Sequence, residues 1–325
     1  MKQKIFTLLL IVATGLSACK KTQDQPDIRV YDQEQIQKYI ADNGLTGFSE
    51  DTTPDGTGTT GIRYKIISQG TGDTLKYSDQ ISLVYTLKSF DGKYISSDTI
   101  TNHINGFLGY FKSQYNLPEG VQLAIHNILR YKGSSMRLLI PSRLAYGVSG
   151  YGSGSITNVN TRIAGNQCLD YYVNVIGDQS AYDDKVINNF LTAHSLTGYS
   201  KDFVLIDSSG IQLKKYYYYK IVTPGTGTVG AISEFSKLTM TYGGSLLNTF
   251  SFDYANYTTA VVYTPYDLKS LYGPAVEHVL EHHATTGTSL QVILPSAIGL
   301  GASSTTGIPA NSVLKFDFTI TGIDL

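Results

Sequence analysis

Short segments in which apolar and polar residues alternate recur along the chain, and glycine-rich turns such as GTGDT and GYGSGS separate them. Alternation with a period of two is typical of β-strands that bury one face. Strands are therefore predicted at residues 63–68, 80–89, 135–140 and 168–176, and again at 213–222, 237–242, 289–294 and 313–323.

Two other segments place apolar residues three or four positions apart, as one face of a helix requires. The first contains Ile36, Tyr39 and Ile40 and stops at Gly44, and the second covers residues 186–191. Each helix precedes a group of strands that are joined by long connections. This order predicts an α+β fold with antiparallel sheets rather than alternating β and α units.

The chain contains an internal repeat, because matching short segments recur at a nearly constant distance. The pairs are Tyr31-Asp32 with Tyr182-Asp183, residues 70–72 with residues 225–227, and Pro141 with Pro295, at offsets of 151, 155 and 154 residues. Small changes in the offset are what loop insertions in a duplicated unit produce. We therefore expect two tandem units, at residues 31–177 and 178–325.

Composition narrows the class of protein. Charged residues make up 16% of the 325 residues, and the chain holds 25 tyrosines, 32 glycines and no tryptophan. The formal net charge of −1 lacks the basic excess that nucleic-acid binding normally needs. No apolar run reaches the length of about 20 residues that a membrane-spanning helix needs. A tyrosine-rich pair of folded domains with a strong β content is what we expect.

The first residues are typical of an exported protein. Lys2 and Lys4 precede an apolar stretch at residues 5–16, and the sequence Leu-Ser-Ala-Cys follows and ends at Cys19. This pattern is typical of a secretory signal peptide. Its ending resembles the lipobox of bacterial lipoproteins, in which the cysteine is acylated and becomes the mature N-terminus.

That resemblance implies a signal peptide at residues 1–18, a lipidated tether at residues 19–30, and a membrane anchor at Cys19 in the cell envelope, facing the periplasm or exposed on the surface. The alternative is an ordinary signal peptide with an incidental cysteine. Lipidation would leave Cys168 as the one remaining cysteine, so no disulfide is expected. We interpret Cys168 as a small buried apolar residue.

Two further segments resemble a known family of enzymes. Residues 308–318 read Ile-Pro-Ala-Asn-Ser followed by a strand, and residues 139–147 read Leu-Ile-Pro-Ser-Arg-Leu-Ala-Tyr-Gly. Both are similar to motifs of the FKBP-type peptidyl-prolyl isomerases, and the resemblance covers about residues 58–177 and 212–325. It implies two half-barrel sheets, each wrapped around a short helix, with an apolar pocket for proline between them.

The resemblance also implies candidate site residues, although both units depart from the family pattern. In the second unit the catalytic candidates are Tyr242, Phe252, Asp253, Ile308 and Phe316. The tyrosine that the family has in the turn after the central strand is replaced there by Leu300. Ordinary core packing of these aromatic residues is the competing interpretation.

In the first unit, weaker substrate-binding candidates are Tyr85, Ile95, Tyr146 and Tyr171. Ile95 and Ser96 replace the phenylalanine and aspartate of the family, and residues 163–166 lack the prolines of its closing loop. The family tryptophan at the pocket floor is absent as well. Leu123 lies near that position in the first unit, and the alignment places Glu277 there in the second.

The predicted function is isomerisation of X–Pro bonds in proline-containing polypeptides, as an aid to protein folding, with no cofactor and no metal. The alternative is a degenerate, non-catalytic module that binds unfolded or partner chains. A competing motif is His278-Val-Leu-Glu-His282, which has the spacing of a zinc peptidase helix. A glycine and a predicted strand follow it within a few residues, so a solvated helix face is the preferred interpretation.

Overall fold

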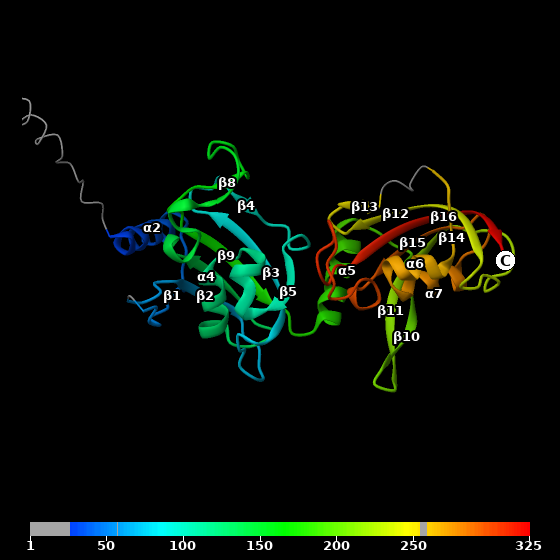
Figure 1. Ribbon diagram of the computed structural model, residues 1–325, viewed down its shortest axis with the longest axis horizontal. Helices are drawn as coiled ribbons and strands as arrows, with labels where there is room; N and C mark the ends of the chain where they lie inside the picture. The colour runs from blue at the N-terminus through cyan, green and yellow to red at the C-terminus, as the bar shows by residue number, and fades with distance from the viewer. Residues whose placement is uncertain (1–26, 57, 254–258) are drawn as a thin grey trace, which may run out of the picture.

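The computed structural model describes residues 27–56, 58–253 and 259–325. Cys19 and the predicted signal peptide lie outside these residues. Two seven-stranded antiparallel sheets and a few helices give an α+β fold, as the sequence predicts. The first sheet is built from residues 49–175 and the second from residues 200–324. Figure 1 shows the two resulting units side by side along the long axis of the molecule.

The first unit begins with helix α2 (Ile28–Asp42). Its sheet has the strand order β1-β2-β6-β9-β3-β4, and β5 also pairs with β3. The strands are β1 (Ser49–Glu50), β2 (Arg63–Ser68), β3 (Gln80–Ser89), β4 (Ile95–Ser96), β5 (His103–Phe107), β6 (Ser135–Ile140) and β9 (Leu169–Val175). Helices α3 (Phe111–Tyr115) and α4 (Glu119–Ala124) precede β6, and β7 (Tyr151–Gly152) pairs with β8 (Arg162–Ile163).

The second unit begins with helix α5 (Gln179–Ala193) and repeats this topology. Its strand order is β10-β11-β15-β16-β12-β13, and β14 also pairs with β12. The strands are β10 (Ser200–Ser208), β11 (Ile211–Thr223), β12 (Lys237–Leu246), β13 (Ser251–Asp253), β14 (Val261–Tyr263), β15 (Ser289–Leu294) and β16 (Leu314–Asp324). Helices α6 (Pro265–Tyr272) and α7 (Pro274–His283) precede β15.

The centre of each sheet is buried on both faces, so helices cover it on each side. Neighbouring residues of a strand point to opposite faces, and Leu138 and Leu139 of β6 are both fully buried. Leu138 packs into the core that contains α4, whereas Leu139 packs against α2. Val292 and Ile293 of β15 divide in the same way between the helices α6 and α7 on one face and α5 on the other.

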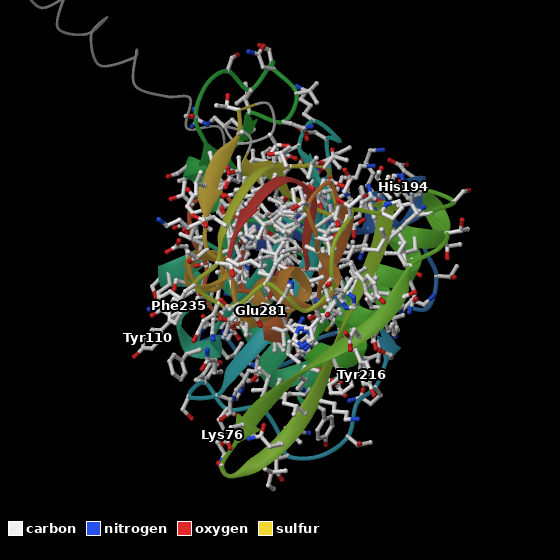
Figure 2. All side chains as sticks on the ribbon, turned by 90° about the vertical axis from the view of Figure 1, so that its right-hand side faces the viewer. Lys76, Tyr110, His194, Tyr216, Phe235 and Glu281 are labelled. Carbon is white, nitrogen blue, oxygen red and sulfur yellow. The ribbon has the colours of Figure 1, made fainter. Side chains whose placement is uncertain are left out.

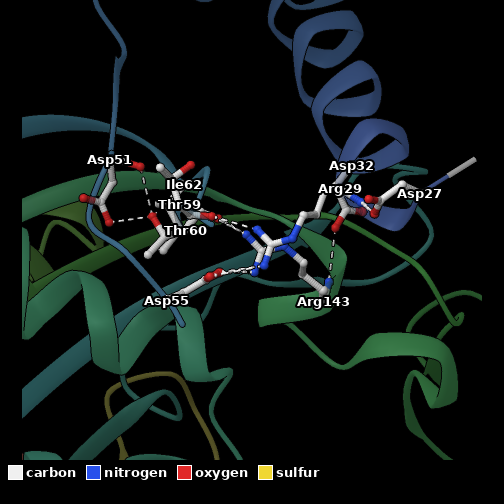
Figure 3. A network of polar contacts seen from close by, with 9 residues as sticks. All are labelled: Asp27, Arg29, Asp32, Asp51, Asp55, Thr59, Thr60, Ile62 and Arg143. Atoms are coloured by element: carbon white, nitrogen blue, oxygen red, sulfur yellow. Dashed lines mark hydrogen bonds and ion pairs between the residues drawn. The ribbon is translucent and has the colours of Figure 1, made fainter. Parts of the chain in front are cut away.

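A polar network joins α2 to the loop before β2 and to the turn after β6 (Figure 3). The carboxylate of Asp55 accepts from the guanidinium groups of Arg29 (3.1 Å) and Arg143 (2.5 Å). Arg143 also donates to the carbonyl oxygens of Thr59 and Thr60, at 2.7 Å each. These contacts fix the first helix of the unit against the sheet edge.

A buried aspartate connects the first helix of each unit to the turn that follows the central strand. Asp32 accepts from the N–H of Arg143 (3.3 Å), and Asp183 accepts from the N–H of Ser296 (2.7 Å). The Cys168 thiol lies 3.5 Å from Asp32 and is 2% exposed, and burial raises its pKa. Cys168 is therefore a buried, protonated thiol, which confirms its interpretation as a small core residue.

All eight predicted strands are present, with ends that shift by at most four residues. The sequence pattern did not predict β10, which forms a long hairpin with β11 that projects from the second unit (Figure 1). β10 is an edge strand in which only Val204 is buried, so its apolar signal is weak. On β11 the tyrosines alternate between faces: Tyr217 is fully buried, and Tyr216 is 49% exposed on the outer surface (Figure 2).

Candidate functional site

Strand β12 brings the candidate residues of the second unit together, because it pairs with both β13 and β16. Gly244 lies opposite Asp253 on one side and opposite Phe316 on the other. A Cβ on Gly244 would lie 2.3 Å from the ring of Phe252, so the glycine makes room for that ring. The Phe252 and Phe316 rings meet edge to face, with centroids 5.7 Å apart.

Asp253 is the polar centre of this cluster. Its Oδ2 accepts hydrogen bonds from the phenol groups of Tyr242 (2.6 Å) and Tyr272 (2.5 Å). Burial and the hydrogen bond to Asp253 raise the pKa of both phenols, so both remain protonated donors. The carboxylate is thereby held in one orientation beside Phe252.

Exposure divides the candidate residues into a buried layer and a rim. Tyr242, Ile308 and Phe316 are 2%, 4% and 0% exposed, respectively. Phe252 and Asp253 are half-buried, so they form the accessible part of the cluster. Leu300 packs against the same apolar core from the turn after β15.

Tyr272 is a member of the cluster that the sequence analysis missed. It is the last residue of α6, and its ring centroid lies 4.9 Å from that of Phe316. Glu277, which the alignment placed at the pocket floor, instead pairs with Lys269 (2.7 Å). The sequence held no signal for Tyr272, because packing rather than spacing brings the end of α6 to Asp253 and Phe316.

The first unit gathers its candidate tyrosines as well. The rings of Tyr85 and Tyr171 lie 5.8 Å apart, and burial raises the pKa of Tyr85 to about 12. Tyr146 stacks on Tyr151 at 4.6 Å and donates to a backbone carbonyl at 3.1 Å. Tyr171 is fully buried, and its hydroxyl has no well-formed hydrogen bond to a described residue.

The remaining first-unit candidate, Ile95, is 44% exposed on the short strand β4. An open depression of about 430 Å³ lies next to the tyrosines and is lined in part by Leu117, Tyr146 and Tyr151. Leu123 packs against the core of this unit as a partly buried side chain. The first unit therefore presents phenols and aliphatic groups, without a carboxylate at the position of Ser96.

The histidines of α7 belong to a separate polar cluster beside strands β10 and β11. His278 lies 2.9 Å from the Tyr217 hydroxyl and stacks on His282, and His283 contacts Asp202 at 2.9 Å. Among the described residues, no group of three or more histidine, cysteine, aspartate or glutamate side chains has a geometry that could hold a metal ion. In the same part of the chain, no helix is long and apolar enough to cross a membrane.

Comparison with known proteins gives matches at the level of solved structures. No protein-family model matches the chain, and no curated protein matches its sequence. The three FKBP domains of wheat FKBP73 align with 86% of this chain and 99% of their own, at 15% identity and a TM-score of 0.31. FkpA from Escherichia coli aligns with 54% of this chain and 72% of its own, at 20% identity and a TM-score of 0.33.

A peptidyl-prolyl cis-trans isomerase from Pseudomonas syringae pv. tomato aligns with 45% of this chain and 96% of its own, at 18% identity and a TM-score of 0.32.

Proposed function

We propose that this chain is a tandem FKBP-like peptidyl-prolyl isomerase whose main site is the aromatic cluster of the second unit. The observation that carries the proposal is the pair Phe252 and Asp253. A half-buried ring lies over a buried aromatic layer, and a carboxylate beside it is fixed by two phenols. An apolar platform with an oriented polar rim suits a proline ring and its flanking peptide groups.

The chemistry requires an apolar surface rather than a reactive group. The X–Pro bond rotates slowly because rotation breaks amide resonance, with a barrier of about 18–20 kcal/mol. The twisted transition state carries less charge separation than the planar ground state, so an apolar, water-poor surface favours the twisted state relative to the planar one. No cofactor or metal is needed for this step.

Each residue of the cluster has a role in this proposal. Phe252 would contact the proline ring from the rim, and Ile308 and Phe316 would form the apolar wall behind it. Tyr242 donates a hydrogen bond to Asp253 and so orients that carboxylate at the rim. Tyr272 packs against Phe316 and donates the second hydrogen bond to Asp253.

A non-catalytic binding module is the second candidate function. Its specific support is the near-complete burial of Tyr242, Ile308 and Phe316, with the Tyr272 ring packed against Phe316. In that case, the rim residues would hold a proline-containing segment without twisting its peptide bond. The first unit, with Ile95 and Ser96 at the rim, fits this second role.

Lipid anchoring is part of the proposal. The lipobox-like ending at Cys19 supports acylation of that cysteine, and the polar residues after it support a flexible tether. The isomerase would then work on proline-containing polypeptides at the surface of an envelope membrane.

The test is the isomerisation rate of a short X–Pro peptide in the presence of the full chain. Phe252→Ala should lower the catalysed rate at least tenfold. Phe235→Ala is the matched control, since Phe235 lies in the same unit but is 67% exposed. Equal rates for the wild type and Phe252→Ala, or no catalysis by the wild type, would exclude the proposed site.

A further inference from the structure

The contact between the two units involves two loops of the second unit. One is the turn at residues 247–250, which leads into β13 and so into Phe252 and Asp253. The other is the segment at residues 299–313, which contains Ile308 and leads into β16. On the first unit, the contacting residues lie on β3 and in the segment just before β5. Figure 1 shows this edge of the first unit facing α5 and the second sheet.

Asn311 connects the second of these loops to the first unit. Its Nδ2 donates to the Oγ of Ser82 on β3 at 3.1 Å. Asn311 has a left-handed backbone (φ 54°), and its N–H donates to the carbonyl oxygen of Gly301 at 2.8 Å. Its side chain is thus directed across the contact by a backbone conformation that the loop itself fixes.

The hydroxyl of Ser82 has a complete set of partners. It lies 2.7 Å from Nε2 of His103 and 2.9 Å from Oε1 of Gln179. The amide nitrogen of Gln179 already donates to Asp183, so its oxygen must accept the Ser82 proton. The two lone pairs of Ser82 then accept from Asn311 and from the Nε2–H of His103. Every donor meets an acceptor, which makes this a specific contact.

The same network reaches the turn after β15. Asp183 accepts from Gln179 through Oδ1 (2.7 Å) and from the N–H and hydroxyl of Ser296 through Oδ2 (2.7 Å each). Asp183 is 1% exposed, so these bonds are shielded from water. Ser82 is therefore connected to the turn at residues 296–298 and, through Asn311, to the segment at residues 299–313 that contains Ile308.

Apolar packing supports the polar contacts. Ile100, in the segment before β5, packs against core residues of the second unit. It lines a small cavity of about 20 Å³ together with Leu247 and Val313, one from each of the two loops. A side chain of the first unit thus completes the core behind the aromatic cluster of the second unit.

Asn248 makes the corresponding polar contact for the other loop. Its Nδ2 donates to the carboxylate of Asp98 and lies 3.1 Å from the hydroxyl of Thr101. Its own Oδ1 accepts from the N–H of Phe250 at 3.1 Å, so the same side chain shapes the turn. The turn that leads to Phe252 is therefore held by the first unit.

We infer that the first unit positions the two loops that carry the second site, so that the site around Phe252 and Ile308 is fully ordered only when the first unit is docked. Ser82 and Asn311 are positioning residues in this arrangement, and neither belongs to the aromatic cluster. The effect on catalysis rests on the proposed function, whereas the ordering of the two loops is independent of it.

The experiment uses the full chain and four variants. Ser82→Ala removes the shared hydroxyl, and Ser82→Thr restores one. Asn311→Gly removes the amide but keeps the left-handed backbone, which glycine adopts readily. Ser209→Gly is the matched control, because Ser209 has the same backbone conformation (φ 55°) at the tip of the β10–β11 hairpin. Amide hydrogen exchange of residues 299–313 is measured for each variant, together with the kcat and KM of X–Pro isomerisation.

We expect Ser82→Ala and Asn311→Gly to speed exchange of the backbone amide at position 311 about five- to tenfold, as the loss of one hydrogen bond predicts. KM should rise by a similar factor with kcat little changed, and Ser82→Thr should recover most of both effects. Unchanged exchange in both variants, or an equal effect of Ser209→Gly, overturns the inference. Faster exchange without any wild-type turnover supports the positioning role and excludes the isomerase proposal.

Discussion

His103 gives the contact between the units a defined pH dependence. The side chain is 6% exposed, its ring meets Tyr182 of α5 edge to face at 5.8 Å, and burial lowers its pKa from 6.5 to about 4. Between these two values the folded chain leaves His103 neutral, whereas the unfolded chain protonates it. The unfolded state then binds more protons, so the free energy of unfolding must fall as the pH falls through this window.

The size of the effect follows from the pKa shift. Each pKa unit corresponds to about 1.4 kcal/mol, so the shift predicts a loss of roughly 3 kcal/mol between pH 7 and pH 4. The variant His103→Gln retains an N–H donor near Ser82 but does not titrate. Its free energy of unfolding should therefore lack this component of the pH dependence.

Urea unfolding, followed by circular dichroism at several pH values between 7.5 and 4, measures the free energy of unfolding of the wild type and of His103→Gln. The difference between wild type and His103→Gln cancels groups that titrate in both, such as Asp183, His278 and His283. We expect the difference to change by about 3 kcal/mol across the window, with wild type losing stability faster. Parallel pH profiles would refute the assignment of a neutral, buried His103.

The remaining predictions concern the site, the anchor and the two units. Phe252→Ala should destabilise the chain by about 1–2 kcal/mol, less than the roughly 3–5 kcal/mol of a fully buried phenylalanine, because the ring is half-buried; a larger loss in thermal unfolding would mark it as core. Asp253→Ala should cost roughly 2–3 kcal/mol, because Tyr242 and Tyr272 lose their acceptor, and Asp253→Asn should recover part of this. Cys19→Ser should move the protein from the membrane to the soluble fraction, and retention in the membrane would contradict the anchor. Fragments 27–177 and 178–325 should each unfold cooperatively, with the second less stable than in the full chain because it lacks Ile100; a disordered fragment would contradict the boundary.

The central strands could be predicted from the sequence because both of their faces are buried. β3, β6 and β15 have the predicted ends, because buried apolar residues on both of their faces meet a core. The short strands β4, β5, β13 and β14 could not be predicted in this way. They have two to five residues each, and their pairing with β3 and β12 decides their conformation.

The candidate site likewise contains residues that could be predicted from the sequence and residues that could not. Tyr242, Phe252, Asp253 and Phe316 could be selected because the repeat and the family motifs fix their spacing. The contact of Tyr272 with Asp253 could not, because the end of α6 is brought there by packing across residues that are distant in sequence. The role of Asn311 is indicated even less by the sequence, because its partner Ser82 lies 229 positions earlier in the chain.

The most direct test of the proposed function is exchange NMR on a short X–Pro peptide with a small amount of the full chain. We predict that the wild type produces cis–trans exchange peaks that the peptide alone lacks. Phe252→Ala should remove them, and Ile95→Ala in the first unit should leave them in place. The absence of catalysed exchange, or its loss in Ile95→Ala but not in Phe252→Ala, would contradict a proline-isomerising site in the second unit.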